Sequence, residues 1–108
     1  MFKYALFTLY WMVFLTVATF SQTNTGEISG VVEDSSGGVL PGVTVVAEHM
    51  ANGFIVERVT DSSGRFFMSS LPIGEWELTA SLVGFKRSIQ TGLTLEIGSV
   101  AELKFNLD

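Results

Sequence analysis

A strict alternation of apolar and polar residues is the feature that most constrains this chain. From Trp76 to Leu82 the sequence reads Trp-Glu-Leu-Thr-Ala-Ser-Leu, so every second side chain is apolar. Successive side chains of a β-strand point to opposite faces, and such a segment therefore buries one face and exposes the other. The last segment has the same pattern, and its expected inward residues are Ala101, Leu103, Phe105 and Leu107. Both segments are predicted to be half-buried strands.

Turn signals rich in Gly, Asp, Asn and Pro separate the apolar segments along the chain after residue 22. Glycine supplies positive φ in such turns, and Asp or Asn side chains hydrogen-bond their own backbone. The strands delimited in this way span residues 27–33, 43–50, 54–60, 65–69, 76–83, 86–95 and 100–107. Short strands joined by tight turns are typical of a sandwich. We therefore expect an all-β fold, a seven-stranded antiparallel Greek-key β-sandwich.

The first residues have a different composition. Lys3 is followed by an apolar run from Ala5 to Phe20, which is the pattern of an export signal. We expect residues 1–21 to be a signal peptide with a hydrophobic signal helix, and residues 22–108 to be one β-sandwich domain. An uncleaved membrane anchor is the alternative, although the run is shorter than the roughly 20 apolar residues of a spanning helix.

The composition excludes several kinds of function. The chain has no cysteine and one histidine, which leaves no disulfide framework, no thiolate zinc site and no multi-histidine metal site. The formal charge is -5, and the few basic residues are scattered apart from Lys86-Arg87, so the sequence predicts no nucleic-acid partner.

Five blocks of the sequence carry a resemblance to a known family. They are Gly30 to Asp34, Gly38 to Val45, Thr60 to Phe66, Leu71 to Leu78, and Gly84-Phe85. In this order and spacing the chain resembles the carboxypeptidase regulatory-like domain, over Gly26 to Asp108. The resemblance implies a transthyretin-like (prealbumin-like) sandwich. It is closest to the copies that follow a signal peptide at the N-terminus of TonB-dependent outer-membrane transporters.

The resemblance implies a function in interaction, without catalysis. The expected role is a periplasmic N-terminal accessory domain of such a transporter, here as a fragment or truncated form lacking plug and barrel. Its expected partners are the plug and barrel or periplasmic proteins, bound through an edge strand or an apolar patch. The expected location is the periplasm or outer membrane of a Gram-negative bacterium, with no membrane insertion after signal cleavage. The alternative is a free-standing secreted β-sandwich that binds carbohydrate through Phe54 or Phe67.

Two aspartates and several aromatic residues can be interpreted structurally or functionally. Asp34 and Asp61 could belong to an oxygen-ligand calcium site, but each turn supplies a single carboxylate, which favours turn stabilisation. Trp76 could stack on a sugar, yet its phase with Leu78 favours the core. Phe66 and Phe67 are adjacent, so only one of them can face the core.

The remaining polar residues do not form a catalytic set. His49, the only imidazole, is expected to face solvent at a strand end. Glu75 and Glu77 share the outer face of one strand, and Lys86-Arg87 is expected to be a solvated edge that discourages strand pairing. A hydroxyl nucleophile needs an oriented base, and none is apparent. The sequence therefore predicts no enzyme activity, no cofactor, and no catalytic, cofactor-binding or metal-binding residue.

Overall fold

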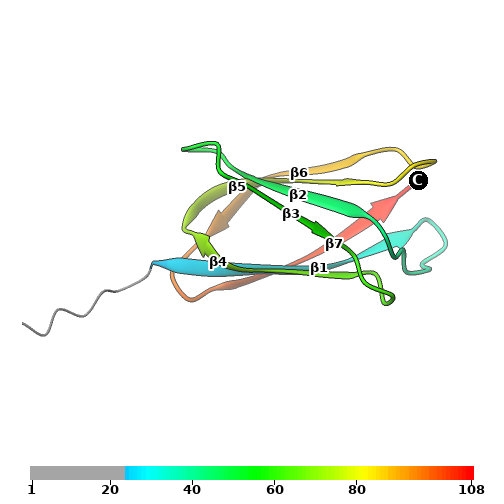
Figure 1. Ribbon diagram of the computed structural model, residues 1–108, viewed down its shortest axis with the longest axis horizontal. Coiled ribbons are helices and arrows are strands. Elements are labelled where there is room, and N and C mark those ends of the chain that lie inside the picture. Colours follow the sequence, from blue (N-terminus) through cyan, green and yellow to red (C-terminus); the bar gives the residue numbers. More distant parts are fainter. Residues whose placement is uncertain (1–23) are drawn as a thin grey trace, which may run out of the picture.

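The computed structural model describes residues 24–108, which form two facing β-sheets (Figure 1). The strands are β1 (Thr25–Asp34), β2 (Thr44–His49), β3 (Ile55–Val59), β4 (Arg65–Pro72), β5 (Gly74–Ser81), β6 (Ser88–Leu95) and β7 (Val100–Leu107). One sheet has the strand order β4-β1-β7 and the other β3-β2-β5-β6. The predicted seven-stranded sandwich is confirmed. The predicted signal helix of residues 1–21 lies outside the described residues.

One strand pair differs from the antiparallel prediction. β1 and β7 run parallel, from Glu27 opposite Val100 to Asp34 opposite Leu107. The other pairs are antiparallel. The prediction of antiparallel pairing is therefore wrong for β1 and β7. Apolar alternation determines which face of a strand is buried, but it carries no information about strand direction. In residues 24–108, no helix is long and apolar enough to cross a membrane.

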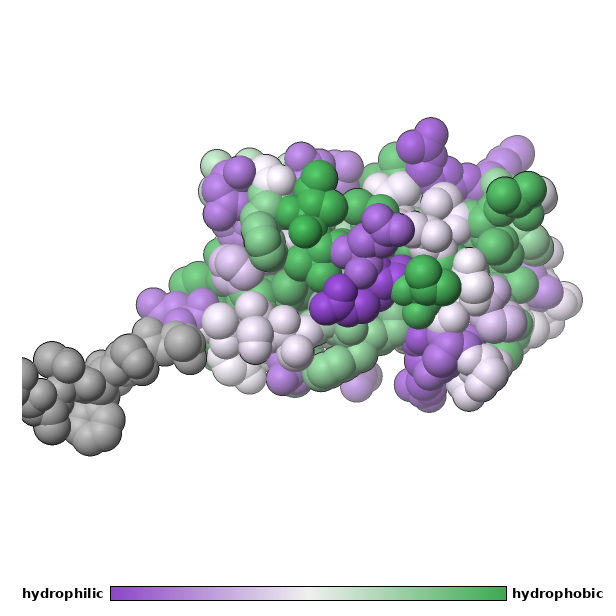
Figure 2. All heavy atoms as spheres, in the orientation of Figure 1, coloured by the Kyte–Doolittle hydropathy of each residue, from purple (hydrophilic) through white to green (hydrophobic). Residues whose placement is uncertain are grey.

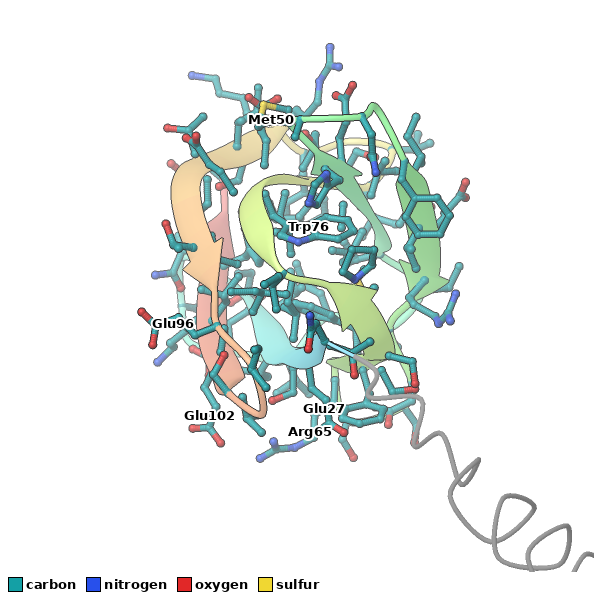
Figure 3. The ribbon with its side chains drawn as sticks, turned by 90° about the vertical axis from the view of Figure 1, so that its left-hand side faces the viewer. Glu27, Met50, Arg65, Trp76, Glu96 and Glu102 are labelled. Atoms are coloured by element: carbon teal, nitrogen blue, oxygen red, sulfur yellow. The ribbon has the colours of Figure 1, made fainter. Side chains whose placement is uncertain are left out.

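The core lies between the sheets and is built from the alternating residues of both. Trp76 is fully buried between the two sheets (Figure 3), and its indole Nε1 donates a hydrogen bond to the Pro72 carbonyl oxygen at 2.9 Å. In β7, Phe105 and Leu107 are buried and Ala101 and Leu103 are half-buried against the core. The inward phase predicted for both segments is confirmed.

Gly30 lets the Phe66 ring of the neighbouring strand β4 lie over the backbone of β1, in the three-stranded sheet. A Cβ atom at this position would lie 2.6 Å from the Phe66 ring and 2.6 Å from the Leu103 carbonyl oxygen. Both separations are far shorter than van der Waals contact, so only glycine fits here. The missing side chain is replaced by the buried ring of Phe66.

Candidate binding surfaces

A shallow trough runs along the outer face of the three-stranded sheet, over β1. It consists of two adjoining hollows of about 380 and 320 Å³. We call it the outer trough. Its lining residues that matter below are Ser29, Gly30, Arg65, Phe67, Glu102 and Lys104.

Strand register explains why the trough forms. Phe67 of β4 and Glu102 of β7 both lie opposite Ser29 of β1. In the next outward row, Arg65 and Lys104 both lie opposite Val31. The central strand thus carries the shorter side chains and its two neighbours the longer ones, which makes a floor with two walls. Arg65 and Glu102 lie on the lower, outer side of this sheet in Figure 3.

The trough carries charges of both signs. The Lys104 Nζ atom lies 3.2 Å from the Glu33 Oε2 atom, an ion pair at the rim whose lysine side chain is 59% exposed. The Arg65 backbone N–H donates to the Asp61 Oδ1 atom at 3.0 Å. This bond is the main cause that lowers the pKa of the Asp61 carboxyl, followed by the bond from the Ser63 N–H. The surface therefore offers hydrogen-bond donors and acceptors beside an aromatic ring.

The adjacent phenylalanines point in opposite directions. Phe66 is 4% exposed, whereas Phe67 is 54% exposed on the wall of the trough. The prediction that only one of them faces the core is confirmed. Phe54 is also half-exposed, and its ring meets the Trp76 indole edge-on with the centroids 6.4 Å apart. Trp76 itself is buried, as its phase predicted, so it offers no open stacking surface.

The expectation that His49 faces solvent is wrong. β2 continues in phase through this residue, which is 5% exposed and ends the inward row that includes Val45 and Ala47. Its Nε2 atom lies 2.8 Å from the Ile73 carbonyl oxygen, so Nε2 carries the donated proton. Its Nδ1 atom has no hydrogen-bond partner within residues 24–108. A Cβ atom on Gly74 would lie 2.8 Å from Nε2, so a glycine is needed for this approach.

Both predicted turn aspartates stabilise their turns. Asp34 Oδ1 accepts hydrogen bonds from the Ser36 hydroxyl at 2.6 Å and from the Gly38 N–H at 2.9 Å. These bonds lower the pKa of the Asp34 carboxyl, with the Ser36 hydroxyl as the largest cause. Asp61 Oδ1 accepts from the backbone N–H groups of Ser63 and Arg65. The described part of the chain contains no group of three His, Asp or Glu side chains that could hold a metal ion.

The other polar residues singled out from the sequence lie apart from the trough. Glu75 is exposed and Glu77 is half-buried, on β5 of the other sheet. Lys86 and Arg87 are exposed, but they precede β6 and do not form its edge, because that strand begins at Ser88. Nothing in the linear sequence marks Arg65, Glu102 and Lys104 as neighbours of Phe67, because only the register of three strands brings them together.

The two facing sheets define a prealbumin-like β-sandwich domain, with an open trough on the outer face of one sheet. The family model of the carboxypeptidase regulatory-like domain matches residues 27–108. The chain therefore belongs to the carboxypeptidase regulatory-like domain family, as the resemblance indicated. No sequence among the curated proteins matches the chain.

Solved structures share the fold at low sequence identity. The Bacillus anthracis TIE protein matches with a TM-score of 0.67 at 19% identity, covering 78% of this chain and 16% of that one. Catechol 1,2-dioxygenase from Pseudomonas arvilla C-1 matches with a TM-score of 0.63 at 13% identity. The match covers 83% of this chain and 54% of the dioxygenase chain. A candidate carbohydrate binding protein from Pseudomonas aeruginosa matches with a TM-score of 0.57 at 16% identity. The match covers 82% of this chain and 92% of that protein. At these identities the likeness concerns the fold alone.

Proposed function

We propose that this protein is a non-catalytic accessory domain of a TonB-dependent outer-membrane transporter, exported to the periplasm of a Gram-negative bacterium, where it binds protein partners. The observation that carries the proposal is the match of the regulatory-like family to residues 27–108, which includes almost the whole sandwich. An apolar run precedes this domain in the sequence, as expected for an exported protein.

The environment of His49 supports a role without catalysis. It is the only histidine of the chain, it is buried, and its Nε2 atom is engaged by the Ile73 carbonyl. A general base must reach the proton that it abstracts, and a buried, hydrogen-bonded imidazole cannot do so. The dioxygenase relative shares only the fold with this chain.

The reading frame of the source DNA tests the transporter assignment. We expect the frame to continue past the codon for Asp108 into a plug and a barrel, recognisable by segments of alternating hydrophobicity. An immediate stop codon would overturn the transporter assignment. Mass analysis of the exported protein tests its location, because a product that begins at Gln22 is expected, and an intact Met1 in the membrane fraction would contradict signal cleavage.

Carbohydrate binding is the second candidate function, favoured by the position of Phe67. Its exposed ring lies beside Ser29 and Arg65 in the outer trough. Sugars bind to protein surfaces that combine an aromatic face with hydrogen-bonding groups. A fellow member of this fold is named as a candidate carbohydrate binding protein.

A panel of immobilised polysaccharides tests this second candidate. We expect saturable binding by the full chain that Phe67→Ala abolishes. Phe54→Ala is the matched control, because Phe54 is also half-exposed but directly precedes β3 of the other sheet. If no polysaccharide is retained, or if both variants bind as well as the unchanged chain, the trough is not a sugar site.

A further inference from the structure

The outer edge of β3 is an unpaired strand edge with a regular backbone. Among residues 24–108, β3 is the last strand of the four-stranded sheet and pairs with β2 alone. The pairing runs without a register shift from Thr44 opposite Val59 to Glu48 opposite Ile55. An edge of this kind presents N–H and C=O groups to any extended chain that arrives beside it.

Hydrogen bonds at the two ends of β3 identify the free groups. The His49 N–H donates to the Phe54 carbonyl at 2.8 Å, and the Thr60 N–H donates to the Val43 carbonyl at 2.9 Å. In an antiparallel ladder, alternate residues point their backbone groups to the same neighbour. Residues 54, 56, 58 and 60 therefore bond toward β2, and the backbone groups of Ile55, Glu57 and Val59 point to the open edge.

The side chains of the same three residues form a defined outer row. Ile55 is 58% exposed and Val59 is 59% exposed, with the exposed carboxylate of Glu57 between them. Figure 1 places β3 on the side of the molecule that faces the viewer. In the same view, Figure 2 shows hydrophobic side chains on either side of a hydrophilic group at this position. An incoming strand would thus meet two β-branched side chains and one negative charge.

The other strand edges are obstructed or irregular within residues 24–108. At β4, the Arg65 N–H and C=O are both bonded to Asp61, and Ser70 has a positive φ of 55°. β6 has a register shift opposite Trp76 to Leu78. At β7, the Gln90 side chain donates to the Lys104 carbonyl at 3.3 Å. β3 is obstructed only at Glu57, whose carbonyl accepts from the neighbouring Arg58 Nη1 at 2.8 Å.

We propose that the β3 edge binds an extended segment of a partner protein in which a basic residue is flanked at both second neighbours by β-branched apolar residues. The basic side chain lies opposite Glu57 and the apolar side chains lie opposite Ile55 and Val59. The partner strand replaces the bond that Arg58 makes to the Glu57 carbonyl. This inference rests on the proposed role as an interaction domain and names its surface and the chemistry of its partner.

Charge argues against a second copy of the chain as the occupant. Two copies that pair all three edge residues about a two-fold axis place Ile55 opposite Val59 and Glu57 opposite Glu57. Like charges directly opposite each other destabilise a strand pair. The chain also has a formal charge of -5, which disfavours self-association and favours a basic partner.

A designed peptide tests the proposal. The probe is Thr-Ile-Thr-Lys-Thr-Ile-Thr, which reads the same in both directions and therefore fits a parallel or an antiparallel approach. Isotope-labelled full chain is kept in a mild detergent and titrated with this peptide. We expect amide hydrogen exchange at Ile55, Glu57 and Val59 to slow by about tenfold or more when the peptide is bound. Unchanged exchange at these three amides, or protection confined to the outer trough, would overturn the proposal.

Charge reversal separates this edge from non-specific attraction. Glu57→Lys is expected to weaken binding of the lysine peptide by about three- to tenfold, and to strengthen binding of the same peptide with Glu in place of Lys by a similar factor. Glu77→Lys is the matched control with the same change of charge on the central strand β5, and it should leave both affinities unchanged. Equal effects of the two variants, or a β3-linked dimer in sedimentation, would overturn the proposal.

A backbone variant gives an independent result. Glu57→Pro removes the N–H that points to the open edge and leaves the bonds to β2 intact, a substitution that edge strands tolerate. We expect it to abolish peptide protection while the far-ultraviolet circular dichroism stays unchanged. Retained binding would overturn the proposal. The reading-frame test gives a separate result. If the frame encodes a transporter but the edge binds no peptide, only this inference is refuted. If the edge binds the peptide but the frame ends in a stop codon, only the transporter assignment is refuted.

Discussion

The imidazole of His49 meets the indole of Trp76 edge-on, with the ring centroids 5.0 Å apart and the ring planes at 79°. The two residues are directly opposite each other on β2 and β5. The pair closes one end of the core, because both side chains are buried and each is hydrogen-bonded to a carbonyl of the β4–β5 region. Edge-to-face aromatic pairs of this kind stabilise a core beyond their buried area.

The first prediction concerns this pair. His49→Ala removes the edge-to-face contact and leaves the Ile73 carbonyl without its donor, so we expect the free energy of unfolding to fall by about 1–3 kcal/mol. Urea denaturation followed by tryptophan fluorescence measures the change. His49→Gln keeps a donor and should lose less. An alanine variant as stable as the unchanged chain would show that the buried ring contributes nothing.

The second prediction contrasts two adjacent residues. Phe66→Ala opens a cavity in the core and should cost about 3–5 kcal/mol, whereas Phe67→Ala changes an exposed side chain and should stay within about 0.5 kcal/mol. The measurement is chemical denaturation of both variants under the same conditions. Similar losses of stability in the two variants would contradict the opposite orientations of the rings.

The third prediction concerns Gly30. Gly30→Ala places a Cβ atom against the Phe66 ring and the Leu103 carbonyl, and we expect overpacking to cost about 1–3 kcal/mol. Thermal unfolding measures it. Combining Gly30→Ala with Phe66→Leu should recover part of the loss, because the ring is removed but the carbonyl remains. An additive double variant would show that Phe66 and residue 30 do not share this space.

The fourth prediction concerns pH. Hydrogen bonds lower the pKa values of Asp34 and Asp61 in the folded chain. A depressed folded-state pKa adds stability that is present above the unfolded value of about 3.9 and is lost as the pH falls through the folded value. Asp61→Asn should therefore flatten the dependence of unfolding free energy on pH below about pH 4.

Denaturation at a series of acidic pH values measures this effect. Glu75→Gln is the matched control, since it makes the same carboxyl-to-amide change on an exposed side chain of β5. Equal flattening in the two variants would attribute the effect to net charge instead of to the hydrogen bonds in the Asp61 turn.

Much of the fold was predictable from local pattern. The alternation around Trp76 and Phe105 gave the correct buried face because side-chain direction in a strand repeats every two residues. The aspartates of the Asp-Ser-Ser-Gly turns were interpreted correctly because their hydrogen bonds reach only two to four residues along the chain. The position of His49 was predicted wrongly, since a polar residue at a strand end was taken to leave the core.

The amino-acid sequence by itself determined the sandwich class, the strands, the turns and the family, because each of these depends on residues close together in the chain or on their order along it. Only the tertiary structure decided the parallel pairing of β1 with β7, the neighbours of Phe67 in the outer trough, and the open edge at β3. These features depend on which strands become neighbours and in which register, and that is set by how two sheets pack together over distances along the chain that no local pattern records.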